Sequence, residues 1–160
     1  MTTVVTITAE EPDTPDSRAL IGELDELLSP LYDASDRHGY SVDKLKRQGV
    51  HFFVVRCGGE PAGCGGVQIF PAAANDVAYG ELKRMYVRPR FRGQGLGRRL
   101  LDHLTGVVRA HGLDVVRLET GIHQTEAIAL YESCGFGRIA PFGTYFESPA
   151  SRCYEKRLTS

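Results

Sequence analysis

A strand pattern, a glycine-rich loop and an amphipathic helix pattern follow one another in the middle of the chain. Residues 79–87 read as a strand that Pro89 ends, and apolar positions repeat at helical spacing from Leu96 until Gly112, which suits a left-handed helix cap. A short apolar run, 115–120, comes next. A strand, a crossover helix and a second strand connect with right-handed geometry and pair in parallel. The sequence therefore predicts one parallel strand pair joined through this helix.

The segments on either side predict an α+β fold. Strands are expected at 4–8, 51–57, 63–70, 136–140 and 153–158, and helices at 16–32, 41–48 and 126–134. The Gly-Gly-Glu-Pro sequence at residues 58–61 favours a turn and an antiparallel pair. We therefore expect a mixed, mostly antiparallel sheet of about six to seven strands with one parallel pair, flanked by about four helices.

Length and charge limit the classes of protein that the chain can represent. With 160 residues, of which 42% are hydrophobic, residues 1–160 are expected to form a single domain. The net charge of -1 does not favour a nucleic-acid or anionic-membrane partner. The N-terminal sequence lacks the basic region of a secretory signal, and the longest uncharged stretch, residues 61–75, is too short to span a bilayer. A cytoplasmic protein is expected.

Cysteine and histidine spacing gives no sign of a metal site. The four cysteines show no CxxC pair, and the five histidines form no HExxH sequence. We expect buried thiols and no bound metal.

The glycine-rich loop, VRPRFRGQGLGRRLL at residues 87–101, is expected to bind an anion. It does not match a dinucleotide fingerprint, because Arg98 stands where the third glycine is needed, and no lysine follows as in a P-loop. Alternate glycines leave room for close approach, and the first turn of a helix offers free backbone N–H groups. An ordinary turn with a solvated basic face is the alternative.

Two motifs resemble those of the GNAT N-acetyltransferase superfamily. Residues 92–97, RGQGLG, match the family signature R/Q-x-x-G-x-G/A, and residues 124–136, QTEAIALYESCGF, resemble the block N-x-x-A-x-x-L-Y-x-x-x-G-F. The expected order of elements from residue 4 to 158 also resembles the family fold. Gln124 departs from the pattern, since the family often has asparagine there.

The resemblance implies that acetyl-CoA is the cofactor and that backbone N–H groups of the loop bind its pyrophosphate. It also implies a bulge at the end of the preceding strand, where the pantetheine arm enters. The cofactor contacts implied in this way are Met85, Tyr86, Val87, Arg92, Gly93, Gln94, Gly95, Leu96, Gly97, Arg98, Gln124, Ala127 and Tyr131. Arg90, Arg92, Arg98 or Arg99 would reach the 3′-phosphate.

Two catalytic roles follow from the same resemblance. An amine of pKa ~10.4 is almost fully protonated at pH 7, so a base would help, and Glu81 stands where many relatives place a glutamate. Lys83 nearby would lower the pKa of Glu81, so Glu119 and His123 remain alternatives. Tyr131 matches the tyrosine that the family uses to protonate the departing thiolate.

We therefore predict direct transfer of an acetyl group, in a ternary complex, to a primary amine of a small molecule or peptide by a monomer or homodimer. A non-catalytic acyl-CoA sensor with the same fold is the alternative. The expected walls of the acceptor pocket are Phe142, Tyr145 and Phe146 on one side and Tyr32, His38 and Tyr40 on the other.

Overall fold

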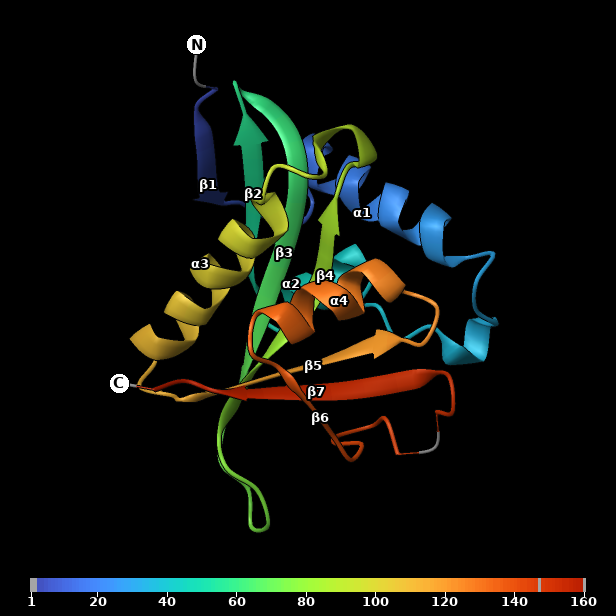
Figure 1. Cartoon of the computed structure of the whole chain (residues 1–160), viewed down its shortest axis with the longest axis vertical. Coiled ribbons are helices and arrows are strands. Elements are labelled where there is room, and N and C mark those ends of the chain that lie inside the picture. Colours follow the sequence, from blue (N-terminus) through green and yellow to red (C-terminus); the bar gives the residue numbers. More distant parts are fainter. Residues whose placement is uncertain (1–2, 147, 160) are drawn as a thin grey trace.

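The computed structural model describes residues 3–146 and 148–159, drawn in Figure 1. The strands are β1 (Val5–Ala9), β2 (His51–Cys57), β3 (Glu60–Phe70), β4 (Tyr79–Val87), β5 (Val115–Gly121), β6 (Gly137–Ile139) and β7 (Ser151–Arg157). The α-helices are α1 (Pro15–Leu28), α2 (Val42–Arg47), α3 (Leu96–Ala110) and α4 (Thr125–Ser133), and short 3-10 turns span Ala34–Asp36 and Pro89–Phe91.

The strands form one sheet in the order β1-β2-β3-β4-β5-β7-β6. Among the described residues, β4 and β5 are the parallel pair and the other neighbours are antiparallel. The crossover from β4 to β5 runs through α3, as the right-handed connection rule requires. The predicted mixed fold with one parallel pair and four flanking helices is confirmed.

Element boundaries differ from the predictions at a few points. Helix α1 ends at Leu28, four residues early, because Pro30 has no N–H to continue the hydrogen-bond ladder. Strand β3 begins at Glu60, three residues before the predicted start at residue 63. Gly58 and Gly59 form the turn by themselves, with φ values of 57° and 83°. Strand β7 begins at Ser151 rather than at residue 153. Ser151 already pairs with Gly121 of β5.

Strand β4 carries a bulge opposite β3. Cys64 pairs with Tyr86 and Gly66 with Lys83, so two residues of β4 face one of β3, and Arg84 has a φ of 57°. The bulge lies at Arg84 and Met85, near the end of the strand, where the resemblance implies one. On its other edge β4 pairs with β5 only through Gly80 and Glu81, as far as the described residues go. Figure 1 shows the two strands diverging beyond this point, with α4 beside the opening.

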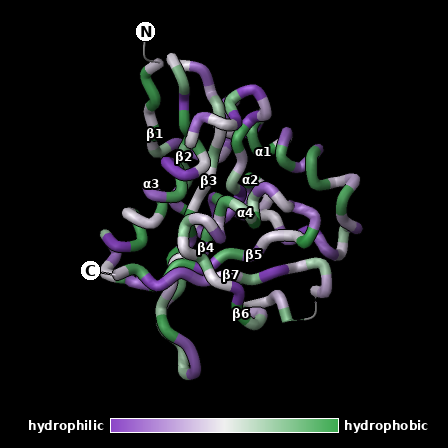
Figure 2. Tube along the Cα trace, in the orientation of Figure 1, coloured by the Kyte–Doolittle hydropathy of each residue, from purple (hydrophilic) through white to green (hydrophobic). Residues whose placement is uncertain are grey.

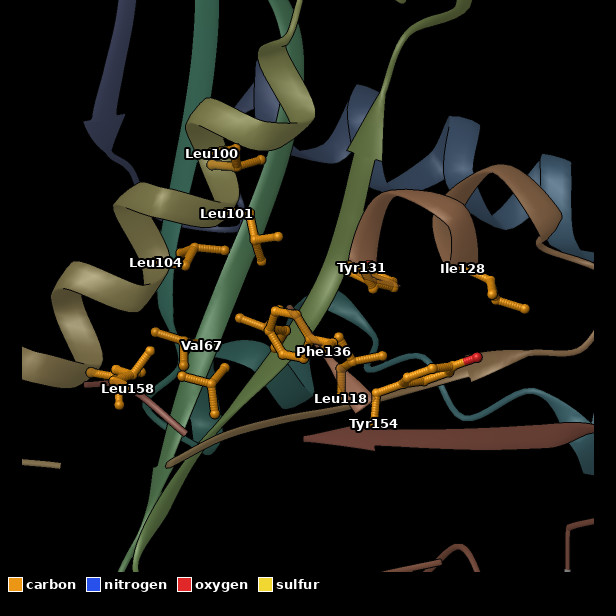
Figure 3. Packing of buried hydrophobic residues seen from close by; sticks show 13 residues of the cluster. Val67, Leu100, Leu101, Leu104, Leu118, Ile128, Tyr131, Phe136, Tyr154 and Leu158 are labelled. Atoms are coloured by element: carbon orange, nitrogen blue, oxygen red, sulfur yellow. The ribbon is translucent and has the colours of Figure 1, made fainter. Parts of the chain in front are cut away.

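Helices cover both faces of the sheet. On one face, the buried leucines of α3 (Leu100, Leu101 and Leu104) pack with Val67 of β3, and Ile128 and Tyr131 of α4 join the same cluster (Figure 3). On the other face, α1 and α2 pack against β2 and β3. Helix α3 alternates between hydrophilic and hydrophobic residues along its length (Figure 2), as an amphipathic helix on a sheet requires.

None of the helices in the described part of the chain has the length and apolar character needed to cross a bilayer. Within residues 3–146 and 148–159, no group of three or more His, Cys, Asp or Glu side chains is arranged to hold a metal ion.

Candidate active site

A groove of about 740 Å³ lies between the loop before α3, the start of α4 and the end of α1. It brings together the predicted cofactor residues from three elements. The lining includes Met85, Tyr86, Val87, Arg92, Gly93, Gly95, Leu96, Gly97, Arg98, Gln124, Ala127 and Tyr131. Gln94 is the one predicted cofactor residue outside the lining, and its side chain is exposed.

The loop at the start of α3 presents backbone donors to this groove. Gly93 and Gly95 have φ values of 80° and 78°, a left-handed conformation that other residues rarely adopt. Gly95 is the N-cap and offers no side chain, and the first helical bond runs from Arg99 N to Gly95 O over 3.1 Å. The N–H groups of residues 96–98 therefore lack helical acceptors. Free N–H groups at a positive helix end fit a pyrophosphate group.

Two of the four candidate arginines line the groove. Arg92 donates from Nε to Val87 O over 3.0 Å, and Arg98 donates to Ser133 Oγ over 3.1 Å. Arg90 pairs with Glu60 at 2.7 Å and, like Arg99, is absent from the lining. Arg92 and Arg98 are thus the arginines best placed to contact an anion in the groove.

A second cavity, of about 440 Å³, adjoins the groove and is called the acceptor cavity below. Four residues line both spaces: Leu24, Met85, Gln124 and Tyr131. Of the predicted wall residues, Tyr32, His38, Tyr40 and Tyr145 line the acceptor cavity. Phe142 is instead packed edge-on against Tyr79 and Tyr145, and Phe146 is 69% exposed.

Glu81 faces the acceptor cavity from β4 and is only 3% exposed. Its Oε2 accepts hydrogen bonds from Lys83 Nζ at 2.7 Å and from the Tyr145 hydroxyl at 2.6 Å. Lys83 Nζ also lies 4.0 Å from the centre of the Tyr40 ring. Burial, together with the charge of Glu81, raises the pKa of Tyr145 far above its ordinary value, so this hydroxyl stays protonated and donates.

Glu119 faces the same cavity from β5 and is partly buried. Its Oε2 accepts a hydrogen bond from Ser151 Oγ at 2.5 Å. Burial raises the pKa of Glu119 above its ordinary value, the hydrogen bond from Ser151 opposes that rise, and the nearby charges of His38 and Glu81 act in opposite directions. Two carboxylates from neighbouring strands therefore line the acceptor cavity.

Tyr131 stands where the groove meets the acceptor cavity. It projects from α4 towards the sheet, is 6% exposed and packs edge-on against Phe136 (Figure 3). Burial raises its pKa well above the ordinary tyrosine value, so the hydroxyl remains a proton donor at neutral pH. Gln124 Oε1 accepts from Gly121 N at 2.9 Å, which holds the turn before α4.

His123, the third candidate base, is exposed and lines the groove rather than the acceptor cavity. Its backbone N–H donates to the Tyr32 hydroxyl over 3.0 Å. The histidine that does line the acceptor cavity is His38, in the segment before α2.

A third cavity, of about 320 Å³, shares one wall with the acceptor cavity. The shared residues are Arg37, His38, Gly39, Tyr40, Glu81, Lys83 and Tyr145. Beyond them the lining is aromatic and basic, from Phe70, Tyr79 and Lys44. Sequence reasoning missed Arg37, Lys44 and the serines near Glu119, because no spacing rule connects residues that only the tertiary fold brings together.

Comparisons with known proteins show the family of the chain. The model of the Acetyltransferase (GNAT) family matches residues 21–136. The chain is 41% identical to the IAA acetyltransferase of Azospirillum brasilense over 154 residues, which cover 96% of the chain and 98% of that protein.

Two solved structures share the fold. A candidate acyl-CoA N-acyltransferase of Klebsiella pneumoniae is 35% identical, with a TM-score of 0.80 over 98% of the chain and 99% of that protein. The PaiA N-acetyltransferase of Thermoplasma acidophilum, solved with coenzyme A, is 18% identical, with a TM-score of 0.71 over 97% and 99% of the two chains. This second likeness concerns the fold alone.

Proposed function

The chain belongs to the GNAT acetyltransferase family, and we propose that it transfers an acetyl group from acetyl-CoA to a primary amine of a small molecule or peptide. The observation that carries the proposal is the junction of two cavities at Tyr131. One cavity presents unpaired backbone N–H groups, and the other presents carboxylates. A donor with a pyrophosphate and an acceptor with an amine suit these two linings.

The acceptor cavity also contains polar atoms without partners. Thr120 Oγ1 and Arg84 Nε are buried and have no hydrogen-bond partner among the described residues, and both residues line this cavity. Buried polar groups are normally satisfied, but these two atoms are inaccessible and lie behind the cavity surface, so a ligand would reach them only after a turn of their side chains.

Residues of the groove would bind the cofactor, and residues of the acceptor cavity would bind the amine. Acetyl-CoA supplies an activated acetyl thioester when it is bound. Arg92, Arg98 and the N–H groups at the start of α3 would hold the pyrophosphate end, and the unpaired edge of β4 near Met85 would hold the arm. Tyr131 would give its hydroxyl proton to the departing sulfur.

A buried carboxylate would take the proton of the acceptor's ammonium group. Glu81 is the residue that the sequence predicts, and Glu119 is the alternative from the neighbouring strand. Both line the wall of the acceptor cavity, so either carboxylate would face an amine bound there.

Turnover is the direct test of the proposal. Purified protein incubated with acetyl-CoA and a library of primary amines is expected to release free thiol in proportion to acetylated amine. An acyl-CoA sensor would instead show a higher melting temperature with acetyl-CoA and no thiol release with any amine. That second result would contradict the proposed activity and support the sensor.

The third cavity predicts a charge preference in the acceptor. Arg37, Lys44 and Lys83 face one carboxylate there, Glu81, and Lys83 already pairs with it. We propose that Arg37 and Lys44 attract an anionic group on the acceptor, with the aromatic lining beside it.

Arg37→Ala is expected to raise KM for phenylalanine about fivefold, since an exposed ion pair contributes up to roughly 1 kcal/mol. KM for phenethylamine, which has no carboxylate, should stay the same, and Arg37→Lys should retain most of the preference. Steady-state kinetics with the two amines measures the difference. Equal changes in both KM values would contradict a role for Arg37 in binding the carboxylate of the acceptor.

A further inference from the structure

A continuous chain of hydrogen bonds leads from Glu119 to the rim of the acceptor cavity. Ser151 Oγ donates to Glu119 Oε2 over 2.5 Å and lies 3.1 Å from Ser148 Oγ. Ser148 Oγ in turn lies 2.7 Å from His38 Nε2. The three contacts join a carboxylate on β5, two hydroxyls at and before the start of β7, and an imidazole from the segment before α2.

Every member of this chain can both accept and donate a proton. A hydroxyl carries one hydrogen and two lone pairs, and a neutral imidazole nitrogen accepts when its hydrogen is on the other nitrogen. All three separations fall within hydrogen-bond range. His38 is half-exposed and lines both the acceptor cavity and the third cavity. The inner end of the chain therefore faces the acceptor, and the outer end is open to solvent.

Glu81 has no comparable path. Its Oε2 accepts from Lys83 and Tyr145, and a protonated lysine cannot receive another proton. The Tyr145 hydroxyl donates to Glu81 and, among the described residues, accepts only from Lys83, so it has no further acceptor to which it could pass a proton. The described contacts thus fix Glu81 as an ion-paired carboxylate, whereas Glu119 is connected to groups that can pass a proton on.

We infer that Glu119 takes the proton of the acceptor's ammonium group and that Ser151, Ser148 and His38 carry it to solvent. This inference rests on the proposed function and selects one of its two candidate bases. Glu119 is the catalytic residue, because it touches the amine, while Ser151, Ser148 and His38 act through it.

The proton balance closes without another reagent. An N–H bond of the ammonium breaks and an O–H bond forms on Glu119, which leaves a neutral amine. Glu119 then donates to Ser151 Oγ as Ser151 donates to Ser148 Oγ and Ser148 donates to His38 Nε2. His38 becomes an imidazolium and releases its Nδ1 proton to water. Exchange of the remaining ring proton with water then restores the Nδ1–H tautomer and the two hydroxyls rotate back, so each step moves one proton and no electrons.

Other titratable groups face Glu119 from several elements and enter the pH dependence. They are His38 before α2, Glu81 and Lys83 on β4, Tyr32 after α1, Tyr131 on α4, Tyr145 before β7 and Cys153 on β7. Burial raises the pKa of Glu119, and the Ser151 hydrogen bond lowers it. Because the ionised carboxylate is the form that accepts a proton, the rate should rise with pH through this pKa.

The experiment compares kcat in six variants, five within this chain of hydrogen bonds and Glu81→Gln, in dilute and in concentrated imidazole buffer. Glu119→Gln should lose about 100-fold in kcat, because an amide cannot take the proton. In dilute buffer, kcat of Ser148→Ala and of His38→Ala should fall about tenfold, which is less than the 10²–10⁴-fold that a general base provides. Concentrated imidazole should restore kcat in both variants. Ser151→Ala should also move the acidic limb of the pH profile upwards, since it removes a bond that lowers the pKa of Glu119. Ser148→Thr, which keeps the hydroxyl, should retain most of the turnover.

Three kinetic results would overturn the relay: no loss in Ser148→Ala and His38→Ala, a loss that imidazole does not restore, or a larger loss in Glu81→Gln than in Glu119→Gln. A readout without turnover separates this failure from failure of the proposed function. The ¹⁵N NMR signal of His38 Nε2 should move in Ser148→Ala, Ser151→Ala and Glu119→Gln, but not in Ser29→Ala, which changes an exposed serine at the end of α1. If the signal responds to Ser148 alone, the chain does not reach Glu119, whether or not the protein acetylates an amine.

Discussion

Replacing Tyr131 with phenylalanine is expected to lower kcat about 100-fold while leaving KM for acetyl-CoA within about twofold. The change removes one hydroxyl from a side chain that is 6% exposed and lines both the cofactor groove and the acceptor cavity. Burial keeps the pKa of this hydroxyl well above the ordinary tyrosine value, so the proton is present at neutral pH. The departing thiolate, with a pKa near ~8.5, would lose the donor beside it.

The control for this prediction is Tyr154→Phe. Tyr154 is another fully buried tyrosine of the same core cluster, and its hydroxyl contacts Glu132 at 3.4 Å, outside both cavities. Tyr154→Phe should keep its kcat, which would show that loss of a core hydroxyl is not enough to lower turnover. Melting curves of both variants should lie close to the wild type. A Tyr131→Phe protein with unchanged kcat would show that this hydroxyl only fills the core.

The parts of the fold that the sequence predicts well are those with a strong local pattern. Strands β2 and β4 begin and end at the predicted residues, and α3 runs from Leu96 to Ala110 as its apolar spacing indicates. The ends of β6 and β7 differ from prediction, because β6 is a three-residue edge strand whose pairing depends on β7 alone. Such a strand is defined by a distant partner rather than by its own residues.

The candidate site likewise has one part that a local sequence motif predicts and one part that depends on distant segments. The anion-binding loop is contiguous in sequence, so its resemblance to the family motif was enough to predict cofactor contacts from residue 92 to 98, and all of these except Gln94 line the groove. The acceptor cavity is assembled from α1, the segment before α2, β4, β5 and the segment before β7. No local pattern could reveal that Lys83 and Tyr145 both bond Glu81, or that Ser148 and Ser151 link His38 to Glu119. Those contacts join segments that only the tertiary fold brings together.

Gly97→Asp is expected to raise the Kd for coenzyme A about 100-fold without lowering the melting temperature. Gly97 is the second residue of α3 and lines the groove. A carboxylate there would face the pyrophosphate, and two like charges about 5 Å apart repel by roughly 3 kcal/mol at an effective dielectric constant of about 20. In the free protein the same charge stabilises the N-terminal turn of the helix by about 0.3–1 kcal/mol. Calorimetry with coenzyme A and a thermal melt measure the two effects.

Gly97→Asn separates the charge from the added volume. A Cβ at residue 97 would come within 3.0 Å of Leu130 Cδ2, so the leucine side chain must shift slightly in either variant. Asparagine has nearly the shape of aspartate and no charge, so most of the affinity should return if repulsion is the cause. Acetyl-pantetheine, which lacks the pyrophosphate, should serve the wild type and Gly97→Asp equally well as an acetyl donor. If both donors lose affinity equally in Gly97→Asp, the start of α3 contacts the arm rather than the phosphates, and the anion site lies elsewhere in the groove.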